Sequence, residues 1–363
     1  MAGMPGGSAE KSDPLEDSNR AAVVAEALSR LKDIDLEANP AVRAVVMKTL
    51  DQARGTPQFV EIVRDFKIKD QDPELLKIAV RNPNNSVGAD ATRLILADGG
   101  FELLKMSLAG TNGVKTAEAL GNTGEKDIVP LLEPIVADAT RDLALRNHAV
   151  HALAQVQEGA ASLLKLARDQ KLPDDLKLIT GSELGNVRWA NVKAEASVLL
   201  PVPPGMNLAP IPPVTQLAQM PGDPKHGAEV FRRDTVGCIK CHQVNGEGVD
   251  FGPNLSEIGT KLGKDALYVA ILDPSAGISF GYEAWQIGLK NGDEDYGLIV
   301  SETAEELAVK SVGGIVTRHK KSDVATREKQ KLSIMPAGLP QAMSTQDLVD
   351  LVEFLSSLKK PAK

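Results

Sequence analysis

The segment Cys238-Ile239-Lys240-Cys241-His242 constrains this chain more than any other feature of its sequence. It has the pattern C-x-x-C-H, which is the attachment signature of c-type haem. Two thiols three positions apart can reach the two vinyl groups of one haem and form thioethers. The histidine that follows is then held over the iron as its proximal ligand. We therefore expect one covalent haem, bound through Cys238 and Cys241, with His242 as an axial ligand.

Two other kinds of site share part of this pattern. A C-x-x-C pair can be a redox-active dithiol or half of a zinc site. A zinc site of this kind needs two further ligands at similar spacing, and the sequence contains only 2 cysteines in all. A redox dithiol is typical of a thioredoxin-like βαβ context, which the surrounding sequence lacks. Haem attachment is therefore the stronger interpretation.

Length and charge narrow the class of protein further. A chain of 363 residues can form two or three domains, and a net charge of −8 argues against nucleic acid as the main partner. No apolar run reaches the roughly 18 residues of a membrane span, and residues 1–20 lack the apolar core of a signal peptide. Haem is attached to C-x-x-C-H outside the cytoplasm. We therefore expect a mature form or a fragment of a periplasmic or otherwise extracytoplasmic protein.

The first 200 residues divide into a short polar lead and a long helical region. Residues 1–18 are rich in Gly, Ser, Pro, Asp and Glu, so we expect them to be disordered. From 19 to 200, apolar residues recur at the three and four spacing of amphipathic helices. The first run is Ala22, Val23, Ala27, Leu28 and Leu31.

An internal repeat organises the helical region. A Leu-Leu pair followed by a charged residue occurs at 75–77, 103–105, 131–133 and 163–165. Two short helices per unit cannot bury their apolar faces alone, so neighbouring units have to stack. The pattern resembles a HEAT-like α-solenoid over residues 19–200. The alternative is an ordinary helical domain in which the Leu-Leu spacing arises by chance.

Two histidines lie in one of these predicted helices. His148 and His151 are at positions i and i+3, and no carboxylate lies nearby in the sequence to complete a metal site. We therefore expect both side chains to pack or to face solvent rather than to bind a metal.

The stretch 201–224 contains eight prolines and separates the helical region from the rest of the chain. Because proline lacks a backbone N–H donor, this density predicts neither a helix nor a central strand. We expect an extended linker, partly in the polyproline II conformation, that acts as a semi-rigid spacer. The domain that contains the C-x-x-C-H segment should then span 225–360.

Three helices are predicted in this second domain. Lys225–Arg233 is the first, and Lys264–Leu272 is the second, ending before a proline. The last helix opens at Ser344, with Asp347 placed to complete a capping box, and runs to about 359. Its apolar residues form one stripe, made of Leu348, Val349, Leu351, Val352, Leu355 and Leu358.

A small antiparallel β insertion is predicted between the second and the last of these helices, over about 281–330. Residues 283–290 alternate between two faces, and Asn291-Gly292 is a strong hairpin-turn signal. Short strands at 296–301, 306–312 and 314–319 follow, which gives four or five strands. The predicted fold class is therefore mainly α, with a helical repeat domain and a second helical domain that carries a β insertion.

The second domain resembles a class I cytochrome c. The residues that carry this resemblance are Gly227, Phe231, Cys238–His242, Gly252-Pro253-Asn254-Leu255, Met335-Pro336 and the last amphipathic helix. More closely, residues 222–360 are similar to a haem-binding domain family of planctomycetes and verrucomicrobia. The further matching motifs are Asp273-Pro274-Ser275, Gly281-Tyr282-Glu283, the β insertion and Met335-Pro336-Ala337-Gly338-Leu339. That domain often follows HEAT-like repeats and sometimes a sugar-dehydrogenase-like propeller, which is missing from this sequence.

The resemblance implies roles for individual residues. The carbonyl of Pro253 should accept a hydrogen bond from the second ring nitrogen of His242 and so fix its tautomer. Met335 should be the sixth ligand of the iron, because a thioether is soft and neutral. Met343 is the alternative axial ligand, although its position near a helix start favours packing. Gly227 and Phe231 should meet Phe354, where the two terminal helices cross.

The sequence as a whole predicts a one-electron carrier rather than an enzyme. With both axial positions filled, the iron has no open site for a substrate. One alternative is a haem peroxidase or gas-sensing protein with a labile sixth ligand. Another is a relay subunit of a sugar-dehydrogenase-like complex, in which the helical repeats dock a redox partner such as a periplasmic dehydrogenase.

The β insertion also has divided charge that bears on such a partner. Residues 291–306 contain six acidic side chains and no Lys or Arg, whereas residues 318–331 contain six basic and two acidic ones. The basic run ends close to Met335, so it could steer an acidic redox partner towards the haem. Alternatively, opposite charges on neighbouring strands pair with one another or stay solvated.

Overall fold

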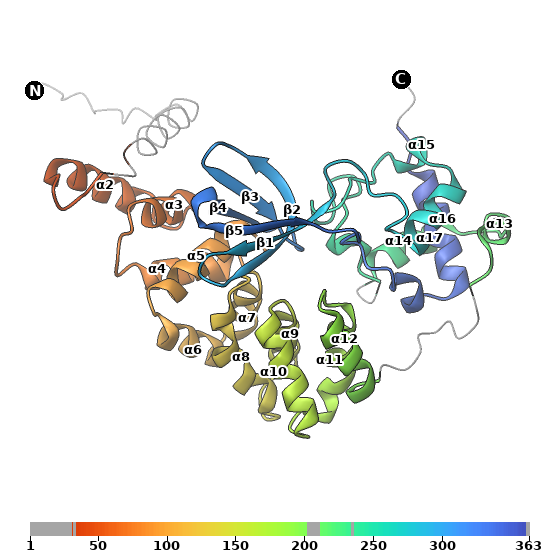
Figure 1. Ribbon diagram of the computed structural model, residues 1–363, viewed down its shortest axis with the longest axis horizontal. Coiled ribbons are helices and arrows are strands. Elements are labelled where there is room, and N and C mark those ends of the chain that lie inside the picture. Colours follow the sequence, from red (N-terminus) through yellow and green to blue (C-terminus); the bar gives the residue numbers. More distant parts are fainter. Residues whose placement is uncertain (1–30, 32–33, 202–210, 234–235, 361–363) are drawn as a thin grey trace, which may run out of the picture.

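The computed structural model describes residues 31, 34–201, 211–233 and 236–360. Figure 1 shows a curved row of helices, a five-stranded sheet and a second group of helices. Each of the three parts has its own apolar cluster. The architecture is therefore mainly helical with one small antiparallel sheet, as the sequence predicts. The predicted polar lead and the helical run that starts at Ala22 lie outside the described residues.

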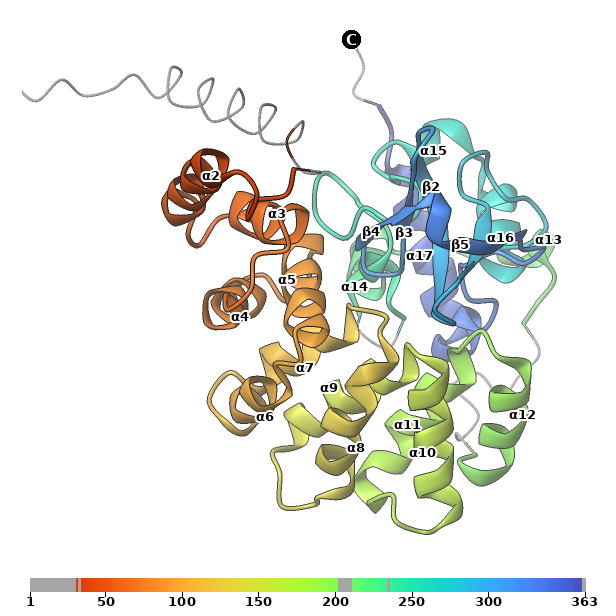
Figure 2. The same cartoon turned by 60° about the vertical axis from the view of Figure 1, so that its left-hand side comes forward.

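The row of helices, called the helical array below, extends from 40 to 199 along an arc (Figures 1 and 2). Its helices are α2 Pro40–Gln52, α3 Pro57–Asp65, α4 Asp72–Arg81, α5 Ser86–Ala97, α6 Phe101–Ala109, α7 Gly113–Gly121, α8 Val129–Ala137, α9 Leu143–Ala154, α10 Gln157–Arg168, α11 Asp174–Asn186 and α12 Ala190–Leu199, with a 3-10 turn η1 at Lys126–Ile128. Prolines occupy the first turn of α2, α3 and α4, where a missing N–H costs nothing.

The four Leu-Leu pairs of the repeat fall in alternate helices of this array, namely α4, α6, α8 and α10. Leu75, Leu104, Leu132 and Leu163 are all fully buried. These even-numbered helices contact one another in order, and so do the odd-numbered helices from α3 to α11. The helices therefore form two rows that share one continuous apolar cluster.

The proline-rich stretch contains a helix, so the prediction of an extended linker is wrong over part of its length. Val214–Leu217 form the one-turn helix α13 immediately after Pro213. Leu217 is fully buried, and Tyr268 Oη donates to its carbonyl over 3.2 Å. No proline interrupts the chain between 213 and 221, so the backbone N–H groups needed for one turn are present. Residues 202–210 lie outside the described residues.

The second group of helices contains all three that the sequence predicts. Its elements are α14 Pro224–Arg232, the 3-10 turn η2 Cys238–Lys240, α15 Ile258–Lys261, α16 Lys264–Leu272, the 3-10 turn η4 Leu339–Ala342 and α17 Thr345–Ser357. Ser344 caps α17, and Asp347 completes the predicted capping box with it. Leu348, Val349, Leu351, Val352 and Leu355 are buried, which confirms the apolar stripe.

Helices α14 and α17 cross closely at a glycine. A side chain added at Gly227 would place its Cβ 2.0 Å from the carbonyl oxygen of Asp350 and 2.8 Å from the Cβ of Phe354. Beside this contact the rings of Phe231 and Phe354 lie 5.8 Å apart between centroids. The predicted meeting of Gly227, Phe231 and Phe354 is therefore confirmed.

A charged network lies next to the same crossing. His226 Nδ1 bonds the carboxylate of Asp350 over 2.7 Å, and this hydrogen bond raises the pKa of His226. Burial alone would raise the pKa of Asp347, but hydrogen bonds from Arg233 and Ser344 outweigh it and lower the pKa to about 2. Asp350 behaves in the same way, because the Asp223 amide and His226 donate to it and lower its pKa.

We expect these groups to limit the stability of the second domain at both ends of the pH range. The two aspartates stabilise the fold above their unfolded pKa of about 4, and this contribution is lost as the pH falls towards their lowered folded pKa. Protonated His226 stabilises the fold below about pH 6.5, and its contribution is lost as the pH rises through its raised folded pKa. Urea unfolding from pH 3 to 9 measures both limits. In His226→Gln the loss at high pH should disappear, whereas an unchanged profile would contradict this assignment.

The sheet is antiparallel and follows the order β4-β3-β2-β1-β5. Its strands are β1 Ala284–Leu289, β2 Glu294–Glu302, β3 Glu306–Lys310, β4 Val316–Lys320 and β5 Val324–Lys329. Gly292 has φ +89° in the predicted hairpin turn, a conformation that favours glycine. Ile287, Leu307 and Val309 form the apolar centre of the sheet. The predicted β insertion of about 281–330 is thus present with five strands.

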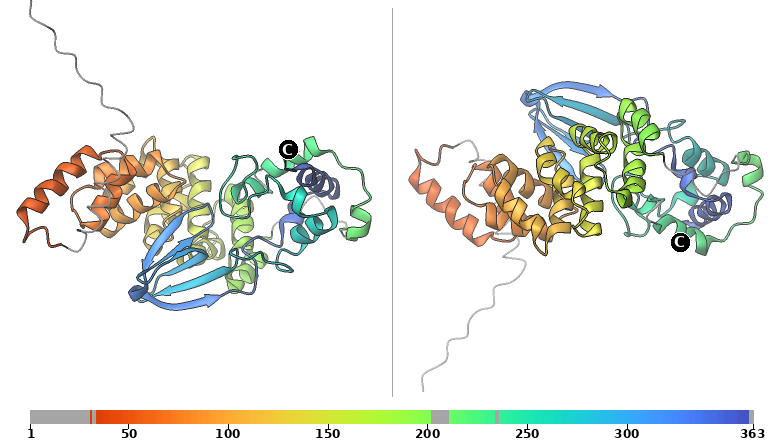
Figure 3. Two further views of the ribbon diagram at one scale, coloured as in Figure 1. Left: turned by 90° about the horizontal axis from the view of Figure 1, so that it is seen from above. Right: turned by 90° about the horizontal axis from the view of Figure 1, so that it is seen from below.

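The sheet lies against one side of the helical array (Figure 3). Arg188, between α11 and α12, places its guanidinium 4.8 Å from the ring of Trp189 and 5.0 Å from the ring of Tyr296 in β2. The same guanidinium bonds Glu294 over 3.2 Å. Lys126 forms an ion pair of 3.0 Å with Asp293 in the β1–β2 turn. The sheet is therefore held between the array and the second group of helices.

Candidate haem site

The C-x-x-C-H segment forms one tight turn after the end of α14. Gly237 has φ +73°, which reverses the chain before η2. The His242 amide donates to the carbonyl of Cys238 over 2.9 Å, so one backbone hydrogen bond closes the turn from Cys238 to His242. Cys238 packs against the apolar cluster of the second domain. The turn therefore holds both thiols and the imidazole on one short, fixed segment.

The imidazole of His242 has a defined tautomer. Its Nδ1 lies 2.8 Å from the carbonyl oxygen of Pro253, as the resemblance implies. Because a carbonyl can only accept, Nδ1 carries the proton and Nε2 carries the lone pair. Burial lowers the pKa of His242, which favours the neutral ring. A neutral imidazole with a free Nε2 lone pair and an oriented Nδ1–H fits an iron ligand.

Gly252 fixes the plane of this ring, a role that sequence reasoning missed. A Cβ at position 252 would lie 2.5 Å from Cε1 and 2.8 Å from Nδ1 of His242. The Gly252 amide also donates to the carbonyl of Cys241 over 2.6 Å. The Gly-Pro pair at 252 and 253 is the sequence signal from which this role of Gly252 could have been predicted. Its glycine lets the backbone approach the ring, and its proline supplies the acceptor.

The two cysteine side chains lie in apolar surroundings, and no disulfide joins them. Burial raises the pKa of Cys238 to about 12 and the pKa of Cys241 to about 11. A reactive dithiol needs a lowered pKa, so this environment disfavours the redox-dithiol interpretation. The described part of the chain also contains no group of three or more His, Cys, Asp or Glu side chains that could hold a metal ion. Neither observation, within the described residues, supports a redox dithiol or a zinc site at these two cysteines.

The two candidate methionines differ in their surroundings. Met335 is half-buried and packs against the same apolar cluster as Cys238. Met343 is 1% exposed and belongs to the centre of that cluster. The Met335 segment is held by short polar contacts, since the Met335 amide donates to Ser333 Oγ over 3.2 Å and the Ser333 amide donates to Ser275 Oγ over 3.1 Å. Met335 is therefore the more accessible of the two candidate sulfur ligands.

The histidines of the helical array have a different environment. His148 is half-buried in α9, and His151 Nδ1 bonds Glu183 Oε1 over 3.1 Å. This hydrogen bond raises the pKa of His151. The sequence did not reveal the carboxylate partner, because Glu183 belongs to the neighbouring helix α11. A single carboxylate and one histidine do not form a metal site, and the expectation of packing or surface roles agrees with this arrangement.

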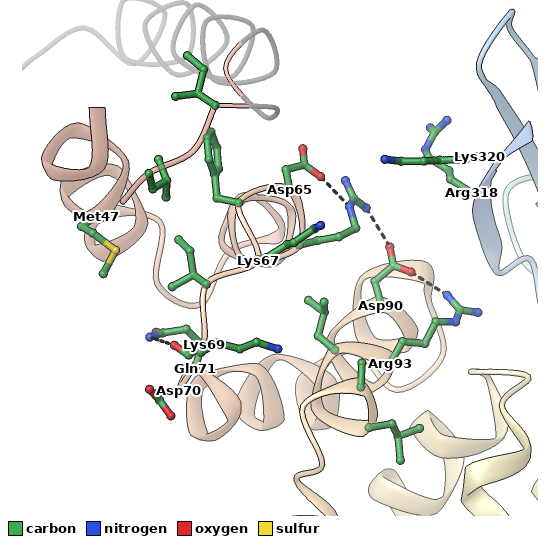
Figure 4. Close-up of a pocket in the computed structure, with 18 of the residues that line it drawn as sticks. Met47, Asp65, Lys67, Lys69, Asp70, Gln71, Asp90, Arg93, Arg318 and Lys320 are labelled. Carbon is green, nitrogen blue, oxygen red and sulfur yellow. Dashed lines mark hydrogen bonds and ion pairs between the residues drawn. The ribbon is translucent and has the colours of Figure 1, made fainter. Parts of the chain in front are cut away.

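A cavity of about 1390 Å³ lies between the array and strand β4 (Figure 4). Arg64 pairs with Asp65 over 2.9 Å, and Arg93 pairs with Asp90 over 2.7 Å. Lys320 and Arg318 point towards this network from the sheet (Figure 4). Among its described lining residues there is no cysteine or histidine. This cavity is therefore separate from the candidate haem site, and most of its charges neutralise one another.

Comparison with known proteins agrees with this geometry. Residues 224–288 match the model of the family Cytochrome c, a range that includes α14, the C-x-x-C-H turn, Pro253 and α16. No curated protein matches the chain significantly. The chain therefore contains a cytochrome c-like domain, which implies covalently bound haem c and suggests haem-based electron transfer.

Proposed function

We propose that this chain is a mono-haem c-type cytochrome that carries single electrons and is not itself an enzyme. In this proposal Cys238 and Cys241 would hold the haem through thioethers, and His242 Nε2 and Met335 would bind its iron. The haem supplies the one-electron chemistry. The observation that carries the proposal is the hydrogen bond from His242 Nδ1 to Pro253 within a C-x-x-C-H turn.

The protein residues around the iron have three tasks. Pro253 holds the proton of His242 on Nδ1, so that Nε2 remains a ligand in both oxidation states. Gly252 keeps the ring plane fixed, so little rearrangement accompanies electron transfer. The half-buried thioether of Met335, as an iron ligand, would favour the ferrous state and raise the reduction potential. A filled sixth position distinguishes this function from a haem peroxidase or gas sensor, which needs that position to be open.

Haem stoichiometry is the direct test of the proposal. One C-x-x-C-H segment should hold one haem per chain, and the thioethers should survive unfolding. Acid–acetone extraction of the denatured protein should therefore leave essentially all of the haem on the polypeptide, and a pyridine haemochrome assay should give one haem per chain. Extractable haem, or two haems per chain, would contradict the proposal.

The sixth ligand is tested by a matched pair of methionine variants. Met335→Ala should abolish the methionine-to-iron charge-transfer band and let carbon monoxide bind the ferrous protein. Met343→Ala should leave the band in place and instead lower stability by about 2–5 kcal/mol, because it empties a fully buried position. Visible spectroscopy and urea unfolding separate the two effects. The opposite pattern would identify Met343 as the ligand.

The helical array is proposed as a HEAT-like docking scaffold for a redox partner, such as a periplasmic dehydrogenase. Its support is the burial of at least one leucine of each of the four Leu-Leu pairs in alternate helices. Cytochrome c domains usually work outside the cytoplasm, and we propose a periplasmic location on that basis. None of the described helices is long and apolar enough to cross a membrane. Co-purification of a dehydrogenase through the array would support this docking role, with the cytochrome domain as the relay.

Several acidic and basic side chains of the β insertion form ion pairs within the chain. Glu302 binds both Lys321 and Arg327, at 2.7 and 3.0 Å. Lys329 binds Glu283 over 3.2 Å. Of the acidic run, Asp293 and Glu294 pair with the helical array through Lys126 and Arg188. These contacts favour the pairing alternative over electrostatic steering by the basic run.

A further inference from the structure

The β3–β4 hairpin, residues 306–320, contacts two parts of the molecule that are far apart in sequence. On its outer side it meets helix α5 of the array. The Val316 amide donates to Ser86 Oγ over 2.8 Å, and Arg93 Nη2 donates to Thr317 Oγ1 over 2.8 Å. Both bonds involve partly buried groups, so they fix the end of β4 relative to the array.

On its other side the hairpin meets residues 249–253, called the proximal loop below. Lys310 Nζ donates to both the carbonyl and the carboxylate of Asp250, each over 3.0 Å. The Lys310 side chain is only 18% exposed. Gly314, with φ +78°, packs so closely that a Cβ there would lie 3.1 Å from Val249 Cγ1. The hairpin therefore holds the proximal loop by both polar and apolar contacts.

The proximal loop is the segment that orients His242. Its Pro253 carbonyl accepts from Nδ1, and Gly252 lies against the ring. Gly252 and Pro253 follow Asp250 by two and three positions. A movement of the Asp250 carbonyl would therefore also move the Pro253 carbonyl, which accepts from His242. A continuous set of contacts thus joins α5, the hairpin, the proximal loop and the imidazole.

We propose that Lys310 is a positioning residue for His242, through which the β3–β4 hairpin couples the helical array to the orientation of the iron's proximal ligand. This proposal rests on the proposed haem function. A partner that binds the array and displaces α5 would then alter the ligand field of the iron without touching it. The partner class is one that contacts the array rather than the haem edge.

The test distinguishes the effect of losing the Lys310 hydrogen bonds, which hold the proximal loop in position, from the effect of removing a positive charge. Lys310→Met removes the hydrogen bonds and one charge, whereas Lys310→Met with Asp250→Asn removes the same bonds and leaves the local net charge unchanged. The electron paramagnetic resonance spectrum of the ferric full-length holoprotein reports the orientation of the axial histidine. We expect the largest g value to shift in both variants. In Lys310→Arg, which keeps a donor and the positive charge, it should stay close to the wild-type value. Lys331→Met, at an exposed position, is the control and should not shift it.

A second variant tests the link to the array. Ser86→Ala with Thr317→Val removes the two hairpin bonds to α5 and should shift the g value in the same direction by a smaller amount. If the g value stays at its wild-type position in this variant, or in the charge-neutral Lys310 variant, the coupling is overturned. A wild-type chain without covalent haem would instead overturn the proposed function and this proposal with it.

Discussion

Replacing Cys238 and Cys241 by alanine should abolish covalent haem attachment and leave residues 225–360 without a stable fold. The apolar cluster of this domain packs against Cys238 and Met335, the residues that flank the proposed haem. Loss of the haem would remove a large part of that core, so attachment and folding are coupled. The single variants keep one thioether and should retain some covalent haem.

The helical array should survive the same double substitution. Its apolar cluster spans Val46 to Leu200 and shares no residue with the cluster around Cys238. Circular dichroism should therefore show the cooperative melting of the array with the transition of the second domain lost. Its midpoint should fall slightly, because Arg188 and Lys126 lose their partners on the sheet. An unchanged melting curve for the whole chain would contradict two independent cores.

Gly227→Val should destabilise the second domain by about 3 kcal/mol, a large effect for the addition of three carbon atoms. The new Cβ would overlap the backbone of Asp350, which cannot move aside as a flexible side chain can. The helices α14 and α17 would have to separate, which also disrupts the Phe231–Phe354 contact. Chemical unfolding of the holoprotein measures the loss.

Gly277→Ala is the matched control for this substitution. Position 277 lies in the same domain, and nothing lies within 4 Å of a Cβ placed there. Its unfolding midpoint should stay close to the wild-type value. Equal stability of Gly227→Val and Gly277→Ala would show that the helix crossing tolerates a larger separation than the structure implies.

The sequence predicts best those features that depend on local chemistry. The capping box of Ser344 and Asp347 and the ends of α16 follow from short-range rules, and the structure agrees with them. The hydrogen bond of His242 to Pro253 was also predicted, because the resemblance placed a Gly-Pro pair at the right distance along the chain. Such features need only a few neighbouring residues to be specified.

Features that depend on tertiary contacts were predicted less well. Helix α13 was missed because the burial of Leu217 outweighs the bias of the flanking prolines. Strand β5 is almost entirely exposed at the sheet edge, so it lacks the alternation that reveals a half-buried strand. The contacts of Lys310 with Asp250 join residues that are 60 positions apart, and no local pattern encodes such a pair.

The two ends of the β insertion lie side by side, because β1 and β5 are neighbours in the sheet. The Gln330 amide donates to the Ala284 carbonyl over 2.8 Å. Three residues later, the Ser333 amide donates to Ser275 Oγ. The segments that lead from the helical domain into the sheet and back therefore run side by side. Because the two ends meet, the path from α16 to Met335 outside the sheet is short, however far the strands extend from it. The sheet is therefore attached to the helical domain at two points, near Met335 through Ser333 and Ser275 and near His242 through Lys310 and Asp250.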